Sequence, residues 1–503
     1  MVDFSRDEAR LGVVGAGAMG QGIVQVALEG GLAVVLHDAR PGAAEDGAKR
    51  VFQRLERLVE KGRLASARIA AMRGHLQIAA GLDGFAGCDA VVEAVVEDLG
   101  TKQTVFRELE KVVRPDCLLA SNTSSLPIAS IARACERRER VAGLHFFNPV
   151  PLMRLVEVIR SVETGADTVR ALIDLGRRLG RTPVEVKDSP GFLVNLGGRA
   201  FTTEGLRLMQ EGVATPAQID AILKDCGGFR MGPFELMDLT GMDVNYPVSR
   251  IVFEAFQNDP RLRTTPEHKL LVDAGRLGRK TGAGHYRYDE GGKMVDPPDP
   301  DHAPAAAPAP AVFVPEVEPP LRRLIEEMGL GTLETDDGES PVLASLLGED
   351  ATSFAVRTGT DVRRLVALDP TGDTSGRVTL MTAPGADPAV RDGLAAAVVR
   401  SGRKVTLIKD SPGFVLQRVR AMIANLGAEM AQIRLATPSD IDLAMKLGLN
   451  YPKGPFEIAA EMGAAATLRI MERLQAITGD DRYRPSLWLR RRALLGLPLD
   501  TPD

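Results

Sequence analysis

The sequence is poor in cysteine, with four cysteines among 503 residues. Cys88, Cys117, Cys135 and Cys226 are scattered, and no two of them form a C-x-x-C spacing. This pattern excludes a disulfide framework and a cysteine-rich zinc site, and it fits a reducing cytoplasm. No other cluster of metal-ligating residue types stands out, so we expect no metal.

Long apolar runs are also lacking. No stretch of about 18 consecutive apolar residues occurs, so no membrane-spanning helix is expected. Residues 1–10 are rich in charge and have no apolar core of the kind found in signal peptides. We therefore expect a cytoplasmic protein.

An excess of basic residues is missing as well. The chain has 62 basic and 67 acidic residues and a net charge of -5, which argues against a nucleic-acid binder. An apolar content of 44% is ample for several buried cores, and the length suggests two to four domains.

A dinucleotide-binding fingerprint opens the chain. Residues 10–14 predict a buried strand, Gly15, Gly17 and Gly20 form a G-x-G-x-x-G loop, residues 21–29 predict a helix, and residues 33–38 predict a second strand ending in Asp38. Gly15 permits the tight turn, Gly17 admits a pyrophosphate, and Gly20 allows the helix to pack on the strand. Asp38 would accept hydrogen bonds from the ribose and repel a 2'-phosphate, which favours NAD over NADP, although Arg40 lies nearby. The alternative is a tight turn without a ligand.

A histidine and a carboxylate mark a second candidate site. His145 ends one apolar run, an Asn148-Pro149 turn follows, and Glu157 stands alone in the middle of the next apolar run. Two short strands would hold both side chains close together. A carboxylate beside an imidazole fixes its tautomer, which suits a general base. A structural hydrogen bond without chemistry is the alternative.

Polar residues follow other predicted strands. Residues 90–98 and 118–125 each read as a strand that ends in acids or hydroxyls, among them Glu97 and Ser124. In a doubly wound sheet such strand ends face the ligand crevice, although either cluster could instead cap a helix. Residues 190–285 read as mostly helical, with Asn195 early in the first helix.

Two basic features suggest phosphate contacts. Residues 43–76 predict a helical pair on which four cations, Arg50, Arg54, Arg57 and Lys61, share one face. This stripe could clamp a polyphosphate or be a solvated face. The glycine-rich loop 278–284 carries Lys280 and could contact a phosphate or be an ordinary terminal loop.

The second half repeats blocks of the first after a proline- and alanine-rich stretch. Three blocks recur 222 residues later: Lys187–Phe192 as Lys409–Phe414, Thr215-Pro216 as Thr437-Pro438, and Gly232–Glu235 as Gly454–Glu457. No histidine follows His302, Asn195 corresponds to Gln417, and residues 375–381, which match the Glu157 region, contain no carboxylate. We predict that the second copy keeps the scaffold without the chemistry.

The motifs together resemble the NAD-dependent L-3-hydroxyacyl-CoA dehydrogenases. They are the glycine loop, Ser121–Leu126, Leu144–Val150, Lys187–Phe192 and Gly278–Gly282. The long form looks like the bacterial 3-hydroxybutyryl-CoA or 3-hydroxyadipyl-CoA dehydrogenases with a degenerate second copy, the latter serving phenylacetate breakdown.

The resemblance implies a fold and a domain order. It implies an α/β Rossmann-type dinucleotide-binding domain, an all-α dehydrogenase C-terminal domain, a degenerate α/β segment and a second all-α copy. The expected ranges are 1–186 for NAD binding, 187–290 for the helical substrate and pairing domain, 291–320 for the linker, 321–404 for the degenerate segment and 405–503 for the second helical copy.

The resemblance also implies roles for residues. His145 would be the base, Glu157 would orient it, and Ser124 and Asn195 would hold the substrate. The implied NAD contacts are Gly15, Gly17, Gly20, Asp38, Glu97, Lys102, Asn148 and Lys280, and the implied CoA contacts are Arg54, Lys61 and Ser124. After Asn195 this chain has Leu196–Arg199 where many members have an Arg-Leu-Leu run, which puts the shape of the acyl pocket in doubt.

Other functions remain open at this point. An NAD-dependent dehydrogenase of a free hydroxy acid would leave the basic stripe without a ligand, and a non-catalytic NAD-binding structural protein would not need His145. We expect an acyl-CoA substrate, no nucleic acid and no membrane partner. We further predict that the two helical copies pair within one chain as a pseudo-dimer, with a homo-oligomer also possible.

Overall fold

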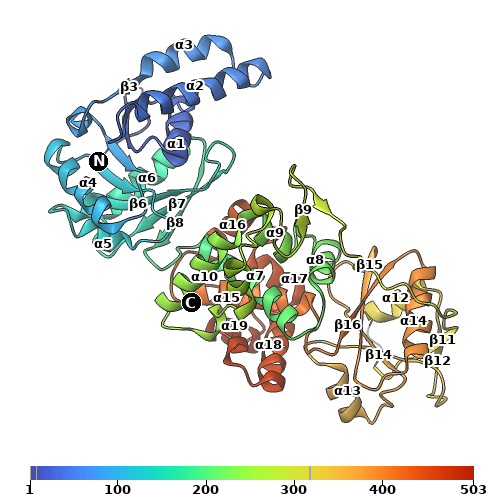
Figure 1. The fold of residues 1–503 in the computed structure, drawn as a ribbon. Coiled ribbons are helices and arrows are strands. Elements are labelled where there is room, and N and C mark those ends of the chain that lie inside the picture. The colour runs from blue at the N-terminus through green and yellow to red at the C-terminus, as the bar shows by residue number, and fades with distance from the viewer. Residues whose placement is uncertain (1, 7, 317–318) are drawn as a thin grey trace. The chain divides into compact units, whose positions relative to one another are not determined.

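The computed structural model of the chain describes residues 2–6, 8–316 and 319–503. The chain forms two compact units (Figure 1). The first unit comprises Met1–Leu196 and Arg434–Leu449, and the second comprises Gly197–Ile433 and Asn450–Asp503. Among the described helices, none is long and apolar enough to cross a membrane.

The first unit is built on an eight-stranded sheet with the strand order β3-β2-β1-β4-β5-β6-β7-β8. Neighbouring strands are parallel except for β6 and β7, which are antiparallel. The strands are β1 (Arg10–Val14), β2 (Ala33–His37), β3 (Leu76–Ile78), β4 (Ala90–Glu93), β5 (Leu118–Ser121), β6 (Val141–Phe146), β7 (Leu155–Arg160) and β8 (Thr182–Lys187). The order reverses between β1 and β4, so a ligand crevice is expected at the carboxyl ends of these strands.

Helices cover this sheet because each has one apolar face. The helices of the first unit are α1 (Ala18–Glu29), α2 (Ala43–Glu60), α3 (Ser66–His75), α4 (Leu99–Val112), α5 (Ile128–Ala132), α6 (Ala166–Arg178) and α16 (Pro438–Leu449), with short 3₁₀ turns η1 (Leu82–Phe85) and η2 (Arg138–Arg140). On α2, Val51, Phe52 and Leu55 are buried while the charged residues lie outside. The core joins these side chains to the apolar strands and to α1 and α6.

The second unit contains helices of both copies, whereas α16 of the second copy belongs to the first unit. Helix α7 (Val194–Gln210) begins in the first unit and continues into the second. The others of the first copy are α8 (Pro216–Asp225), α9 (Pro233–Thr240), α10 (Met242–Ala255), η3 (Pro260–Leu262), α11 (Pro266–Asp273) and η4 (Arg279–Thr281), followed by the hairpin β9 (Arg287–Tyr288) and β10 (Met294–Val295). The second copy contributes α15 (Leu416–Gln432), α17 (Pro455–Met462), α18 (Ala464–Thr478), η5 (Asp481–Tyr483) and α19 (Leu487–Leu494).

A second sheet completes this unit, with the order β12-β11-β13-β14-β15-β16. Its strands are β11 (Ala311–Phe313), β12 (Gly331–Leu333), β13 (Val342–Ser345), β14 (Leu365–Leu368), β15 (Arg377–Thr382) and β16 (Lys404–Lys409), and its helices are α12 (Pro319–Glu327), α13 (Ala351–Thr358) and α14 (Pro388–Arg400). The predicted fold class, an α/β dinucleotide-binding domain, an all-α region and a further α/β segment with a second all-α copy, is confirmed.

The stretch predicted as a linker is only partly irregular. Ala311–Phe313 forms β11, which pairs with β12 and β13, because Val312 is buried in the core of the second sheet. His302 is also tied to this sheet, since its backbone N–H donates to Val405 O and its Nε2 lies 2.9 Å from Asp392 Oδ1. Three residues therefore suffice for a strand where neighbouring strands on both sides supply hydrogen-bond partners. Residues 317–318 lie outside the described residues.

Candidate active site

His145 and Glu157 lie directly opposite each other on the antiparallel strands β6 and β7. His145 Nδ1 is 2.6 Å from Glu157 Oε2, and both side chains are buried. The ring of Phe147 lies 4.5 Å from the imidazole, and the ring of Phe192 lies 5.8 Å from it. A carboxylate on Nδ1 leaves Nε2 as the ring nitrogen that can exchange a proton with a ligand.

The second oxygen of Glu157 holds the start of a helix. Glu157 Oε1 accepts hydrogen bonds from the backbone N–H groups of Leu193, at 3.1 Å, and Val194, at 2.9 Å. Because α7 begins at Val194, this carboxylate satisfies amides that the helix cannot satisfy itself. Asn195 is the next residue, so one carboxylate fixes both the imidazole and the segment that carries Asn195.

Ser124 lies in a turn that Glu97 holds together. Glu97 Oε1 accepts hydrogen bonds from Thr123 Oγ1 at 2.6 Å, from the Ser124 N–H at 3.0 Å, and from the N–H and Oγ of Ser125. Burial raises the pKa of Glu97, but these hydrogen bonds and Lys102 outweigh burial and lower it. Asn195 Nδ2 lies 3.4 Å from Ser124 O, which makes these two candidate residues neighbours.

The sequence did not single out Glu93, which lies beneath this turn. Glu93 Oε1 accepts from Lys102 Nζ at 2.7 Å, and Glu93 Oε2 accepts from Ser121 Oγ at 2.7 Å. Lys102 is buried and also lies 3.2 Å from Glu97, so its ammonium is part of the scaffold under the loop. A single carboxylate inside the apolar run of β4 was a usable signal, because the same pattern marks Glu157.

The glycine loop between β1 and α1 has room for a ligand only on one side. A Cβ on Gly15 would lie 2.4 Å from Ala94 O, and one on Gly20 would lie 1.8 Å from Gly15 O. A Cβ on Gly17 would meet nothing within 4 Å, and no described side chain caps α1 at this residue. The bare backbone at a helix amino terminus fits the pyrophosphate of a dinucleotide.

Asp38 stands beside this loop. Its Oδ2 accepts from the Ala16 N–H at 2.8 Å, and its Oδ1 accepts from the N–H and Nε of Arg40. Burial raises the pKa of Asp38, but these hydrogen bonds outweigh burial and lower it, so the side chain is a carboxylate. Arg40 itself is exposed on the solvent side of this pair.

The four cations of the basic stripe on α2 differ in their contacts. Arg54 is half-buried and donates to Gln25 Oε1 at 3.0 Å and to Gln21 Oε1 at 3.2 Å, so it also ties α2 to α1. Arg50, Arg57 and Lys61 are exposed, and none of them forms an ion pair with a described residue. The exposed cations are thus free to meet a polyanion.

The remaining candidates are Asn148 and Lys280. Asn148 is exposed in the turn after β6 and precedes a cis peptide bond to Pro149. Lys280 belongs to the second unit, where its ammonium pairs with Asp243. Its loop is organised by Asp238, which accepts the N–H groups of His285 and Tyr286. Within the part of the chain that the structure describes, no group of histidine, cysteine and carboxylate side chains could hold a metal ion.

Comparison with known proteins identifies the family. Residues 10–189 match the NAD-binding domain of 3-hydroxyacyl-CoA dehydrogenase. Residues 191–288 and 413–498 both match the C-terminal domain of 3-hydroxyacyl-CoA dehydrogenase. The chain belongs to the 3-hydroxyacyl-CoA dehydrogenase family. It is therefore an NAD-dependent enzyme that acts on the 3-hydroxyacyl group of a CoA thioester.

Relatives of this 3-hydroxyacyl-CoA dehydrogenase differ in length. An Escherichia coli protein named 3-hydroxyadipyl-CoA dehydrogenase is 37% identical over 485 residues, covering 96% of this chain and 97% of the relative. A probable 3-hydroxybutyryl-CoA dehydrogenase of Deinococcus radiodurans is 40% identical over 279 residues, covering 56% of this chain and all of the relative. The crystal structure of 3-hydroxybutyryl-CoA dehydrogenase from Escherichia coli matches with a TM-score of 0.84 and 35% identity, covering 97% of this chain and 99% of that one.

The second copy of the dehydrogenase has a different set of residues at the equivalent of the candidate site. Residue Thr379 on β15 takes the place of Glu157, and the residue opposite it in the ladder is Asp369, whose N–H donates to Thr379 O. Gln417, which takes the place of Asn195, donates to Asp369 Oδ1 at 2.9 Å and accepts from the Gly348 N–H. Burial raises the pKa of Asp369 to about 6. Gln417 and Asp369 thus bond to each other at the positions where the first copy has Asn195 and His145. No imidazole is present there.

Proposed function

We propose that His145 is the base that takes the proton from the 3-hydroxyl group of the substrate, and that Glu157 orients it. The observation that carries this proposal is the 2.6 Å contact between the two buried side chains near the carboxyl end of β6. The glycine loop follows the carboxyl end of β1 in the same sheet, where a doubly wound fold places its cofactor.

Proton transfer follows from this geometry. Glu157 accepts a hydrogen bond from Nδ1–H of His145, and this tautomer leaves the Nε2 lone pair available to the substrate hydroxyl. When His145 gains the proton, the adjacent carboxylate stabilises the imidazolium. NAD, when bound, accepts the hydride from C3. In the reverse direction His145 returns the proton to the 3-oxo oxygen.

Ser124 and Asn195 supply hydrogen-bond donors for the substrate. Their proximity, with Asn195 Nδ2 3.4 Å from Ser124 O, supports a joint role at the C3 oxygen and the thioester end. Glu97 fixes the turn of Ser124, and Glu157 fixes the helix start of Asn195. Donors that are held before the substrate arrives cost little reorganisation during the reaction.

The cofactor would be held by the loop and the strand ends. Gly15, Gly17 and Gly20 would leave room for the pyrophosphate, and Asp38 would accept hydrogen bonds from the adenosine ribose. Lys280 and Asn148 are further proposed contacts. Glu97 and Lys102 support the same crevice from below, since Lys102 is buried against Glu93.

The CoA moiety would be held by the exposed face of α2. Arg57 and Lys61 are exposed cations near the carboxyl end of this helix, and their charge suits the phosphates of CoA. Arg54 contributes at the same face while it bonds to α1, and Ser124 is a further proposed CoA contact. The free hydroxy acid alternative gives these cations no partner.

The substrate we propose is a short-chain L-3-hydroxyacyl-CoA, either 3-hydroxybutyryl-CoA or 3-hydroxyadipyl-CoA. Both names occur among relatives that span nearly the full length of this chain. Steady-state kinetics with these two thioesters and with 3-hydroxydecanoyl-CoA tests the proposal. We expect kcat/KM to be highest for one of the two short substrates, and a preference for the ten-carbon substrate would contradict it.

We further propose that the second copy acts as a structural partner of the first copy within the chain. Reciprocal contacts in the second unit support this pairing. Arg261 of η3 reaches Glu429 on α15 at 2.8 Å, and Arg482 of η5 reaches Glu204 on α7 at 2.9 Å. Contacts that recur in both directions are the mark of a two-fold interface.

A further inference from the structure

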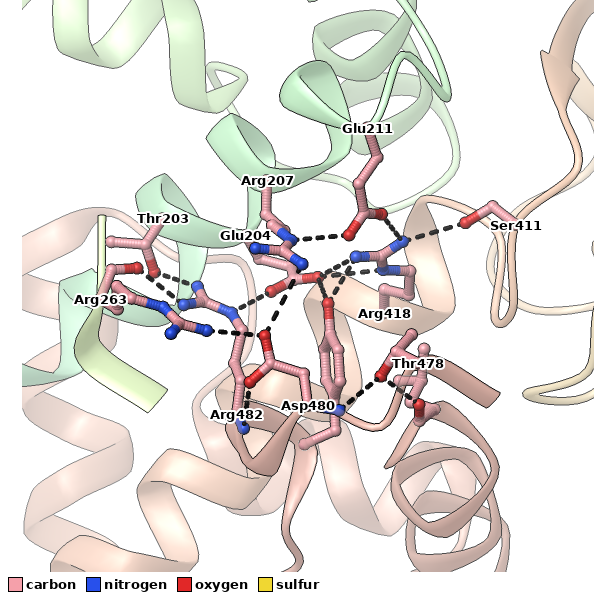
Figure 2. A network of polar contacts seen from close by, with 12 residues as sticks. Thr203, Glu204, Arg207, Glu211, Arg263, Ser411, Arg418, Thr478, Asp480 and Arg482 are labelled. Atoms are coloured by element: carbon pink, nitrogen blue, oxygen red, sulfur yellow. Dashed lines mark hydrogen bonds and ion pairs between the residues drawn. The ribbon is translucent and has the colours of Figure 1, made fainter. Parts of the chain in front are cut away.

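Glu204 lies at the centre of a buried ionic network between the two copies (Figure 2). Its Oε1 accepts from Arg418 at 2.8 Å and from Tyr483 Oη at 2.9 Å, and its Oε2 accepts from Arg482 Nε at 2.9 Å. Glu204 and Arg418 have no exposed side-chain surface. Every hydrogen bond and ion pair that the Glu204 side chain makes with a described residue reaches the second copy.

The second copy is in turn anchored by carboxylates of the first. Arg418 also pairs with Glu211 at 2.8 Å, and Arg482 Nη2 donates to Thr203 Oγ1 at 2.6 Å. Arg207, one turn from Glu204, is already paired with Glu211 and Asp480. Burial raises the pKa of Glu204, but Arg418 and Arg482 outweigh burial and lower it to about 2. Glu204 is therefore a buried carboxylate whose charge the other copy neutralises.

Glu204, Glu211 and Arg418 of this network have apolar counterparts on the opposite side of the pair. The residues 222 positions after Glu204 and Glu211 are Leu426 and Ile433, and the residue 222 positions before Arg418 is Leu196. Leu426 and Leu196 are buried. The short turns η3 and η5 correspond at an offset of 221 residues. Asp259 accepts a hydrogen bond from the N–H of Arg261, and Asp480 accepts one from the N–H of Arg482. At this offset the counterpart of Tyr483 is Leu262. The positions of Glu204, Glu211, Arg418 and Tyr483 are thus polar on one side of the interface and apolar on the other, where Arg261 pairs with Glu429 instead.

This asymmetry decides which copies can pair. If two first copies met through this face, leucines would replace Arg418 and Tyr483, and Glu204 would lose two of its three partners. If two second copies met, Leu426 and Ile433 would stand in place of Glu204 and Glu211. Arg418 would then lose both of its carboxylate partners. A buried charge left without its partner is strongly destabilising, so both like pairings carry a cost that the mixed pairing avoids.

We propose that Glu204 and Arg418 make this face selective, so that the first copy accepts the second copy and rejects another first copy. The partner it fits is a helix that presents one arginine beside a short turn that presents an arginine and a tyrosine, which in this chain are α15 and η5. The proposal rests on the pairing of the two copies stated above, and it is independent of the dehydrogenase reaction, since none of these residues belongs to the proposed active site.

A double-mutant cycle on the full-length chain tests the energetic link. We expect Glu204→Leu and Arg418→Leu each to lower Tm by on the order of 10 °C, and the double variant to lower it by clearly less than the sum. The exposed pair Lys269 and Asp273 on α11 is the control, and alanine at either position should shift Tm by no more than about 2 °C. Additive losses for Glu204→Leu and Arg418→Leu would overturn the proposal.

Co-expression tests selectivity. One full-length chain carries Glu204→Arg, and a second, with a different affinity tag, carries Arg418→Glu and Arg482→Glu. Each chain alone should show a lowered Tm, because like charges meet inside it. Together they should copurify above the level of two wild-type chains and recover Tm, because each variant copy finds an opposite charge in the other chain. A wild-type Tm for either chain alone, or no recovery of Tm on co-expression, would overturn the proposal. A loss of acetoacetyl-CoA reduction that leaves the Tm and copurification results as expected would concern only the proposed active site.

Discussion

At the scale of single residues, Glu157 connects two parts of the candidate active site. One oxygen holds Nδ1 of His145, and the other holds the N–H groups of Leu193 and Val194. The sequence predicted the pairing with His145, because a lone acid and a histidine on adjacent strands fall opposite each other. It could not predict the bond to the helix start, because that contact depends on how the chain returns after β8.

Asp38 controls the choice of cofactor in our proposal. Replacement by alanine removes a charge-assisted hydrogen bond to the ribose and the repulsion of a 2'-phosphate. We expect Asp38→Ala to narrow the preference for NAD over NADP by about 10- to 150-fold. Steady-state kcat/KM for both cofactors measures this. A wild-type enzyme that uses NAD and NADP equally well would show that Asp38 does not discriminate.

The family resemblance and the structure suggest different roles for Lys102. The motif places it among the cofactor contacts, whereas the structure buries its ammonium between Glu93 and Glu97. The burial of Lys102 depends on how α4 packs back on β4 and on the loop that follows β4, and the local sequence does not show this packing. The lone carboxylate of Glu93 was the one signal in the sequence that something polar had to lie beneath the loop.

At the scale of elements, α2 is the proposed CoA-binding face. The structure separates Arg54, which bonds to α1, from the exposed Arg57 and Lys61. We expect Arg57→Glu with Lys61→Glu to raise KM for acetoacetyl-CoA by about 2- to 10-fold at low salt, with a smaller effect at high salt because exposed charges are screened. NADH oxidation assays measure both.

A matched reversal on another helix is the control for α2. Arg107 and Lys111 have the same spacing on the exposed side of α4. Their reversal to glutamate should leave KM for acetoacetyl-CoA unchanged. If the α2 and α4 variants behave alike, the stripe on α2 is only a solvated face.

The hairpin of β14 and β15 carries a buried acid in place of the proposed catalytic pair. The pKa of Asp369 is raised from 3.8 to about 6 by burial, so the folded protein binds a proton that the unfolded chain has released. The protonated Asp369 therefore contributes to the stability of the folded protein below about pH 4, and this contribution is lost as the pH rises through 6. Asp369→Asn keeps the Oδ1 that accepts hydrogen bonds from Gln417 and Thr371. Because asparagine does not ionise, the variant does not lose stability as the pH rises through 6.

We therefore expect Asp369→Asn to stabilise the protein at pH 8 by about 1–3 kcal/mol, with a smaller gain at pH 4.5. Thermal unfolding of both proteins at the two pH values measures the difference. An Asp369→Asn variant that is less stable than wild type at pH 8 would mean that the carboxylate is needed in its charged form.

The elements that the sequence misplaced are short and depend on neighbours. Ala311–Phe313 was assigned to the linker because proline and alanine surround it, yet it forms β11. The repeat offset of 222 residues holds for β15 and α15, but the ladder places Asp369 rather than Ala367 at the position of His145. Such a shift of two residues preserves the alternation of a strand, so the hydrophobic pattern alone does not reveal it.

At the scale of the whole molecule, one chain contains two helical copies and one set of candidate catalytic residues. The glycine loop, His145 and Glu157 occur in the first half, and Asp369, Thr379 and Gln417 stand at the matching positions of the second. The repeated blocks made the scaffold of both copies predictable. The selective contacts around Glu204 were not predictable, because they join residues more than 200 positions apart.

The central claim is that the dehydrogenase reaction depends on His145 as its base. The most direct measurement is acetoacetyl-CoA-dependent NADH oxidation by full-length His145→Gln, with the exposed His75→Gln as the control and NADH binding measured for both. We expect His145→Gln to lower kcat by about 10²- to 10⁴-fold with NADH affinity retained, and His75→Gln to behave as wild type. A His145→Gln enzyme with near-normal kcat would contradict the claim.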